Sequence, residues 1–166
     1  MSNATYVLDE KLLASKGSRF VNYIVDIIAI LCLIFVFGVV MAIIANLFVL
    51  DDLMYKMGNL SDFEGRLLFL AISIFYYSIF EGIFGRSFGK LITGTIVVDE
   101  NGEKPSFSII FKRTLCRLIP FEGFSFLGSR GWHDSISGTY VVSKKDLENE
   151  VKLFHEFNLI GNDEVI

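Results

Sequence analysis

Three polar side chains stand at the start of a long apolar run, and their spacing places them on one face of a helix. Arg19, Asn22 and Asp26 follow one another at intervals of three and four residues, which aligns them along a single helical stripe. Ionisable groups within or beside a membrane are functional candidates, because each is costly to place in hydrocarbon. In that position Asp26 can bind a proton or a cation, with Arg19 as its counter-charge. The structural alternative is that the three side chains join helix ends through buried hydrogen bonds.

Glu81 is a fourth candidate, because it is the single charged residue in a second apolar run from Leu67 to Gly85. Antiparallel packing of the two runs would bring Glu81 to the level of Arg19 and Asp26. An ion pair between Glu81 and Arg19 is the simplest structural role. Two acids beside one arginine would nevertheless leave a net negative cluster, which a cation or a proton has to balance. This imbalance predicts ion or proton binding.

The two apolar runs predict two membrane-spanning helices, at about residues 19–50 and 67–85. No charged residue lies between Ile27 and Leu50, and about 20 apolar residues are enough to cross the hydrocarbon core. The first run is too long for the apolar part of a signal peptide, so a retained helix is expected. Residues 1–18 are expected to form a polar N-terminal tail broken at Gly17, with Ser18 as the N-cap of the first span.

Charge placement predicts the orientation of the spans. The connection at residues 51–66 is acidic, whereas the chain after residue 85 is rich in lysine and arginine. Because basic segments stay on the cytoplasmic side, both termini are expected in the cytoplasm and residues 51–66 outside.

Residues 105–119 predict a basic amphipathic helix lying in the membrane surface. On a helical wheel its phenylalanines and leucines cluster on one side, and Arg113 and Arg117 lie opposite. Such a helix attracts anionic lipid headgroups, so the expected lipid contacts are Lys112, Arg113 and Arg117, with Trp132 as an interfacial anchor. The charges argue against a third span. Whether residues 107–127 lie on the membrane or dip into it stays open.

A short sequence echo predicts a small cytoplasmic β element. Thr93–Val98 ends in an Asp-Glu-Asn-Gly turn signal, and its GTIVV motif returns as GTYVV at residues 138–142. The two segments are expected to be strands of one sheet. In the C-terminal tail, residues 143–166, the spacing of Leu147, Val151 and Phe154 predicts an amphipathic helix.

Motifs for catalysis or metal binding are weak. The GRSFGK segment lacks one residue of a phosphate-binding loop and has Leu91 after the lysine, so its glycines are expected to turn the chain out of the membrane. Adjacent His133 and Asp134 do not build a catalytic triad. Both are expected to be structural polar residues, with Asp134 accepting hydrogen bonds from Arg113, Arg117 or backbone N–H groups. No enzyme activity, metal, cofactor or nucleic-acid partner is expected.

The chain from about Arg19 to Val142 resembles the RDD family of bacterial membrane proteins. The residues that carry the resemblance are Arg19 and Asp26 at the first span, FEGIFGRSFGK at the end of the second, VVDENGEKPSF, and WHDSISGTYVV. The resemblance matches the family's one arginine and two aspartates to Arg19, Asp26 and Asp134. It implies a location in the bacterial inner membrane and a part in transport, with ion or proton exchange suggested. Family members commonly have a further hydrophobic segment before the final aspartate, which is short and charged in this chain.

Together these features predict a mainly α membrane protein with two transmembrane helices, a basic interfacial helix and a small cytoplasmic β element, the membrane domain covering residues 19–142. The leading hypothesis for function is an ion- or proton-linked transport component, with Asp26 and Glu81 as titrating groups and Arg19 as their counter-ion. Because two spans cannot enclose a pathway, this requires a homo-oligomer. The alternative is a non-transporting membrane module that binds anionic lipid or partner proteins. The sequence does not identify a substrate.

Overall fold

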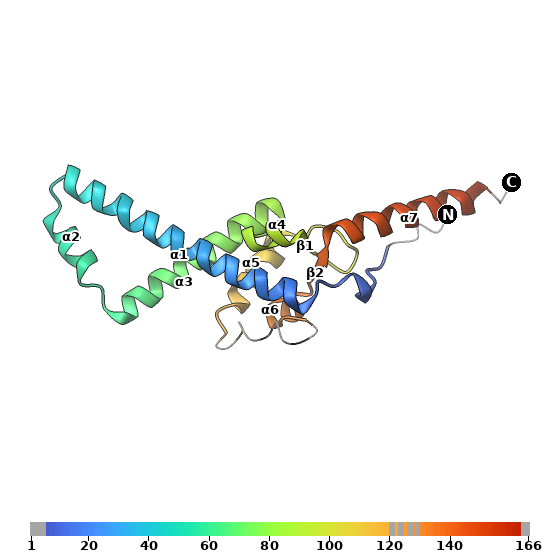
Figure 1. Ribbon diagram of the computed structural model, residues 1–166, viewed down its shortest axis with the longest axis horizontal. Coiled ribbons are helices and arrows are strands. Elements are labelled where there is room, and N and C mark those ends of the chain that lie inside the picture. The colour runs from blue at the N-terminus through green and yellow to red at the C-terminus, as the bar shows by residue number, and fades with distance from the viewer. Residues whose placement is uncertain (1–5, 120–121, 123–124, 126–127, 129, 164–166) are drawn as a thin grey trace.

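The fold is elongated, with two long helices that cross and a mixed α and β region at one end (Figure 1). The computed structural model describes residues 6–163 apart from 120–121, 123–124, 126–127 and 129. The predicted aromatic stretch around Phe121, Phe124, Phe126 and Leu127 therefore lies outside the described residues, as does the end of the chain after residue 163.

The first long helix, α1 (Lys16–Leu47), begins earlier than the sequence predicts. The N-cap is Ser15 and not Ser18, since the Ser15 hydroxyl accepts a hydrogen bond from the backbone N–H of Ser18 at 3.1 Å. Gly17 consequently lies inside the helix and does not end the preceding segment. The polar stripe of Arg19, Asn22 and Asp26 falls in the first three turns of α1 and is buried.

The second long helix, α3 (Asp62–Phe84), also begins before its apolar run. Ser61 and Glu64 form a reciprocal capping box, which starts the helix within the polar connection. The rest of that connection is a short helix, α2 (Asp51–Gly58). At its other end α3 stops at Gly85, which adopts a left-handed φ of 70° that glycine tolerates without steric cost.

Both α1 and α3 are long and apolar enough to cross a membrane. They meet where Ile30 packs against Tyr76 and Tyr77. Most other apolar side chains of α1 are exposed, for example Phe35 at 73%. A surface of this kind is not suited to water and needs lipid or protein as its neighbour.

The remaining elements gather at the end opposite α2 (Figure 1). They include α4 (Phe88–Thr93) and the antiparallel strands β1 (Thr95–Val98) and β2 (Tyr140–Ser143), in which Val97 pairs with Val141. The echoed motifs therefore form one two-stranded sheet, as predicted. The helix α7 (Lys144–Asp163) follows β2, and the N-terminal segment, including a short 3₁₀ helix at Glu10–Leu12, packs on the sheet through Leu12 and Leu13. Both ends of the described chain thus lie on the same side of the molecule.

The basic amphipathic segment forms α5 (Phe107–Cys116), which packs on α3 and on α6 (Trp132–Ser137). Its orientation is the reverse of the expected one. Ile110, Arg113 and Thr114 face the protein and are buried, whereas Phe107 and Phe111 are exposed. The polar side of this helix therefore lies inside the fold and its apolar side lies outside, an arrangement that suits contact with lipid.

Gly89 of α4 has no room for a side chain, because it sits directly against the backbone of α1. A Cβ added there would lie 2.4 Å from the carbonyl oxygen of Asn22 and 2.6 Å from its Cα. We expect Gly89→Ala to separate α4 from α1 and to lower the free energy of unfolding by about 1–3 kcal/mol, the usual cost of overpacking. Thermal unfolding of the purified chain in detergent measures this.

Gly38→Ala is the matched control, since a Cβ on this α1 glycine would meet nothing within 4 Å. It should leave the melting temperature unchanged or slightly raised. Equal melting temperatures for the two variants would contradict the close contact at Gly89.

Candidate functional site

Asp26 is buried and joins three segments of the chain. Its Oδ1 accepts hydrogen bonds from the Tyr76 hydroxyl and the Gly89 N–H, both at 2.8 Å, and its Oδ2 accepts one from the Ser87 hydroxyl at 2.7 Å. An ionised carboxylate is an acceptor only, so three donors fit it well. The sequence predicts Asp26 as a buried polar residue but gives no sign of Tyr76 or Ser87 as its partners.

Asn22 lies one turn before Asp26 and contacts the same part of the chain. Its side-chain amide is 2.6 Å from the Thr93 hydroxyl and 3.1 Å from the Thr95 hydroxyl. With the amide nitrogen turned toward α4, it also donates to the carbonyl of Gly89 at 2.8 Å. The polar stripe of α1 is therefore the surface on which α4 and the start of β1 are held.

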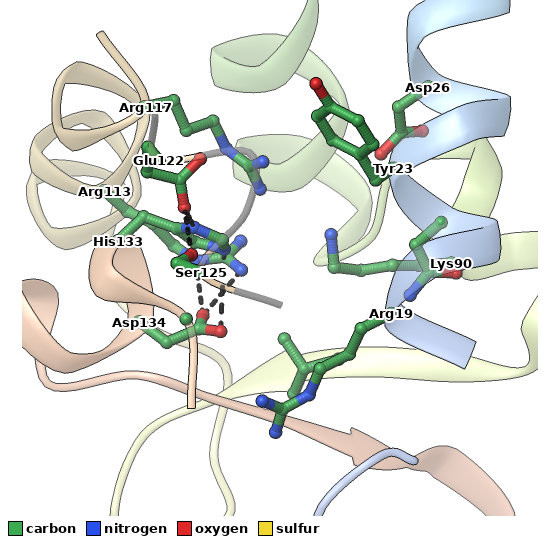
Figure 2. Close-up of a pocket in the computed structure, with 13 residues that line it drawn as sticks. Arg19, Tyr23, Asp26, Lys90, Arg113, Arg117, Glu122, Ser125, His133 and Asp134 are labelled. Atoms are coloured by element: carbon green, nitrogen blue, oxygen red, sulfur yellow. Dashed lines mark hydrogen bonds and ion pairs between the residues drawn. The ribbon is translucent and has the colours of Figure 1, made fainter. Parts of the chain in front are cut away.

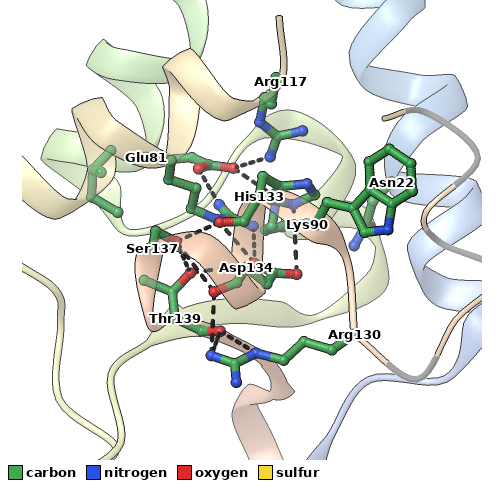
Figure 3. A network of polar contacts seen from close by, with 12 residues as sticks. Asn22, Glu81, Lys90, Arg117, Arg130, His133, Asp134, Ser137 and Thr139 are labelled. Atoms are coloured by element: carbon green, nitrogen blue, oxygen red, sulfur yellow. Dashed lines mark hydrogen bonds and ion pairs between the residues drawn. The ribbon is translucent and has the colours of Figure 1, made fainter. Parts of the chain in front are cut away.

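Glu81 is fully buried and is surrounded by cations (Figure 3). Lys90 donates to its Oε1 at 2.7 Å and Arg117 donates to the same oxygen at 3.2 Å. Arg113 donates to Oε2. The sequence predicts an ion pair of Glu81 with Arg19, whereas in the structure Glu81 forms ion pairs with Lys90 of α4, Arg113 of α5 and Arg117, the C-cap of α5.

Arg113 bridges two carboxylates at the centre of the site. Besides Glu81 it contacts Asp134, whose Oδ1 accepts from Arg113 Nε at 3.0 Å and from Nη2 at 2.7 Å. Burial alone would raise the pKa of Asp134, but the Arg113 guanidinium holds that pKa below its ordinary value. The side chain of Arg113 is 0% exposed, so the expectation that it binds lipid headgroups is wrong: desolvation of the guanidinium is compensated by protein carboxylates and not by lipid phosphate.

His133 lies between two carboxylates. Its Nδ1 contacts Glu122, and its Nε2 is 3.5 Å from Asp134 Oδ2. Burial and the nearby Arg117 lower the pKa of His133 to about 4, so the imidazole is neutral at pH 7. Although burial alone would raise the pKa of Glu122, the hydrogen bond from His133 lowers it to about 2. Glu122 also accepts a hydrogen bond from Ser125 at 3.0 Å.

The residues matched to the three family positions line one pocket of about 50 Å³. Figure 2 shows Arg19 and Asp26 on α1, with Lys90 beside them, facing His133 and Asp134 across this space. Arg19 and Asp134 are 115 positions apart in the chain, and each is buried. The fold thus brings together polar side chains that the sequence places at opposite ends of the domain.

The charge balance of the site differs from the expected one. Among the described residues the carboxylates of Asp26, Glu81, Glu122 and Asp134 are accompanied by four buried or nearly buried cations, namely Arg19, Lys90, Arg113 and Arg117. The predicted net negative cluster is therefore corrected to a balanced one, because α4 and α5 supply cations that the comparison of two helices alone did not include.

The other residues expected to contact lipid are Lys112, Trp132 and Arg117, and only the first two lie on the surface. Lys112 and Trp132 are exposed, with Trp132 at 48%, whereas the Arg117 side chain is 14% exposed and stacks on Tyr77 at 3.9 Å. Six further residues of the site were not predicted from the sequence, namely Tyr76, Ser87, Lys90, Glu122, Ser125 and Thr139. The GRSFGK motif contained a usable signal for Ser87 and Lys90, since both lie beside the close-packed Gly89.

Comparison with known families gives one informative result. A model of the RDD family matches residues 13–144, most of the chain and all of the site described above. Comparisons with curated proteins and with solved structures gave no significant match.

Removing the charge of Glu81 should strongly destabilise the fold. In Glu81→Gln the cations of Lys90, Arg113 and Arg117 lose their shared carboxylate, and uncompensated buried charge costs about 3–5 kcal/mol. Chemical unfolding in detergent measures the loss. Glu148→Gln is the control, because its pair with Lys144 is exposed and should contribute less than about 1 kcal/mol. Similar losses in both variants would contradict the role of the buried network.

Stability should also fall in mild acid because of His133. Its pKa is about 4 in the folded chain and about 6.5 when unfolded, so between these values the unfolded chain binds more protons. The free energy of unfolding therefore decreases as the pH falls from 6.5 to 4, by up to about 3 kcal/mol. Glu122 and Asp134 add their losses below that range, since their pKa values are also lowered.

The pH dependence of unfolding, compared between variants, tests this assignment. His133→Gln should flatten the profile between pH 4 and 6.5. His155→Gln should leave it unchanged, because His155 is exposed on α7. A slope that persists in His133→Gln would show that another group titrates.

Proposed function

This chain belongs to the RDD family, whose members are membrane proteins, and from that premise we propose that it is an ion- or proton-linked transport component. Its two long apolar helices agree with a membrane protein. The observation that carries the transport proposal is the pocket at the base of these helices, which is lined by Arg19, Asp26 and Asp134. Ionisable groups buried within or beside a membrane are costly, and for that reason they mark binding sites and proton pathways.

Asp26 is the group through which a proton would affect the packing of helices. Its Oδ1 accepts a hydrogen bond from the backbone N–H of Gly89. Because a backbone N–H can donate but cannot accept, Oδ2 is the oxygen that can take a proton. The new O–H would donate to Ser87 Oγ, and the Ser87 hydroxyl, which now donates to Asp26, would turn to another acceptor. Protonation of Asp26 would thereby weaken the attachment of α4 to α1.

The second titrating unit in this proposal is the pair of His133 and Glu122, and not Glu81. Glu81 is held by three cations, which suits a permanent structural role. His133 lines the pocket and is kept neutral at pH 7 by burial and by Arg117. A movement of Arg117 away from the imidazole would raise the pKa of His133 and favour proton uptake.

Two spanning helices in one chain do not enclose a pathway, so the proposal includes assembly of several copies in the bacterial inner membrane. The exposed apolar surface of α1 offers a face for such contacts. Both ends of the described chain lie opposite α2, and the basic residues after α3 support a cytoplasmic position for that side, by the positive-inside rule.

The alternative function, a non-transporting membrane module that binds anionic lipid, has one observation in its favour. The outer side of α5 exposes Phe107, Phe111 and Leu115 together with Lys112. Trp132 is exposed on α6. These side chains suit a position in the membrane interface.

Ion and proton flux in liposomes tests the transport proposal. The parent chain should move protons when an ion gradient is imposed, and both Asp26→Asn and His133→Gln should reduce that flux at least tenfold. Asp146→Asn should behave as the parent, because Asp146 is exposed on α7, away from the pocket. Melting temperatures of all variants establish that each is folded before flux is compared.

Absence of flux in the parent would remove the transport proposal and leave the lipid-binding alternative. Unchanged flux in folded Asp26→Asn would show that the pocket is not on the pathway. If Asp26→Asn fails to fold, the flux of His133→Gln decides the question in the same way.

A further inference from the structure

A second cavity, of about 160 Å³, lies between α1, α3 and α5. Its wall is mainly hydrocarbon, from Ile27 and Ile30 of α1, Phe69, Leu70 and Ile74 of α3, and Leu118 just after α5. Leu70 and Leu118 are 36% and 40% exposed, so the cavity opens onto the apolar outer surface of the spanning helices. An apolar cavity of about 150 Å³ accommodates a benzene molecule, which means that this one has room for about six carbons of a chain.

One end of the cavity is polar and adjoins the charged pocket. Tyr23, Arg117 and Glu122 line both spaces. The aliphatic hydroxyls on the wall already have acceptors, since Ser73 donates to the Phe69 carbonyl and Thr114 to the Ile110 carbonyl. The inner end is therefore marked by a guanidinium and a carboxylate.

Arg117 has a hydrogen-bonding group that the described residues leave unused. Its Nη2 donates to Glu81 and its guanidinium stacks on Tyr77, but its buried Nε has no hydrogen-bond partner. A buried donor without an acceptor costs about 1–3 kcal/mol, and more on a charged group. Such a group calls for an acceptor that enters from the cavity.

The surrounding charges favour an anionic acceptor. Glu122 is the carboxylate that lines this end, and its Oε1 is occupied by Ser125 and His133. Lys90 and Arg113 share Glu81 with Arg117. Glu81 is thus shared among three cations and offers no acceptor to Arg117 Nε.

We propose that this cavity binds one acyl chain of an anionic phospholipid, whose phosphate accepts a hydrogen bond from Arg117. The acyl chain passes between Leu70 and Leu118, packs against the apolar wall of the cavity and continues into the bilayer. A phospholipid combines the required parts, since it is present at high concentration around a membrane protein and joins a chain to a phosphate. This differs from headgroup attraction to a basic surface, because it needs the cavity as well as the charge.

Thermal unfolding of the purified full chain in detergent tests the proposal, with the fluorescence of Trp132, the single tryptophan, as the signal. Dioctanoyl phosphatidylglycerol should raise the melting temperature saturably, by about 5 °C or more. Dioctanoyl phosphatidylcholine, glycerol phosphate and octanoate should each give less than a quarter of that shift.

Three variants separate the contributions of charge and cavity. Arg117→Gln and Ile74→Phe should lose the shift caused by phosphatidylglycerol, the first by removing the phosphate donor and the second by filling the wall of the cavity. Lys112→Gln removes one exposed positive charge from the same helix and should keep the shift. Ile74→Phe leaves the ionic network intact, so it decides the question if Arg117→Gln does not fold.

Any one of five results would overturn the proposal. Equal shifts with phosphatidylcholine would remove the requirement for an anion, and an equal shift with glycerol phosphate would remove the requirement for a chain. An equal shift with octanoate would identify a fatty acid as the ligand. Loss of the shift in Lys112→Gln, or its retention in Ile74→Phe, would indicate attraction to the protein surface.

Discussion

The burial of charge within a mostly apolar chain is the constraint on which this structure depends. Glu81, Arg113 and Asp134 form a continuous ionic bridge between α3, α5 and α6, and Glu81 and Arg113 are fully buried. Removing such groups from water costs several kcal/mol each, so the bridge is tolerable only with all of its members in place. The network therefore constrains the geometry: α5 must bring Arg113 to Glu81, and α6 must bring Asp134 to Arg113.

The six-residue helix α4 connects that network with the polar stripe of α1. Ser87 and Gly89 donate to Asp26, while Lys90 donates to Glu81 and lies 3.4 Å from the Ser87 hydroxyl. A change in the protonation of Asp26 therefore acts on the same short segment that holds Lys90 against Glu81. Because Gly89 has no side chain, α4 packs directly on the backbone of α1, and the contacts that link Asp26 to Lys90 are short.

Local patterns in the sequence were enough to predict the two long helices, α5, α7 and the strand pair, but not the short helices α2, α4 and α6 or the partners of the buried charges. The two spans follow from apolar length, and the pairing of β1 with β2 follows from the echo of GTIVV in GTYVV. The helical wheel placed Arg113 opposite the phenylalanines of α5, yet the assumption that arginine faces outward reversed the helix. In a membrane the polar face turns inward, and only the fold shows that Glu81 and Asp134 are there to receive it. Contacts such as Tyr76 to Asp26 join positions 50 residues apart and have no local signature.

Arg117 occupies the boundary between the two cavities, and this gives the proposed functions a common physical basis. Its charge is one of the causes that lower the pKa of His133 in the polar pocket. Arg117 also lines the end of the apolar cavity, and its buried Nε has no hydrogen-bond acceptor among the described residues. An anion bound to Arg117 would offset part of that positive charge, so the pKa of His133 would rise. Thermodynamic linkage then requires the converse: proton uptake by His133 strengthens anion binding by the same factor. Lipid occupancy at this position would therefore be coupled to the protonation of His133 through the guanidinium of Arg117.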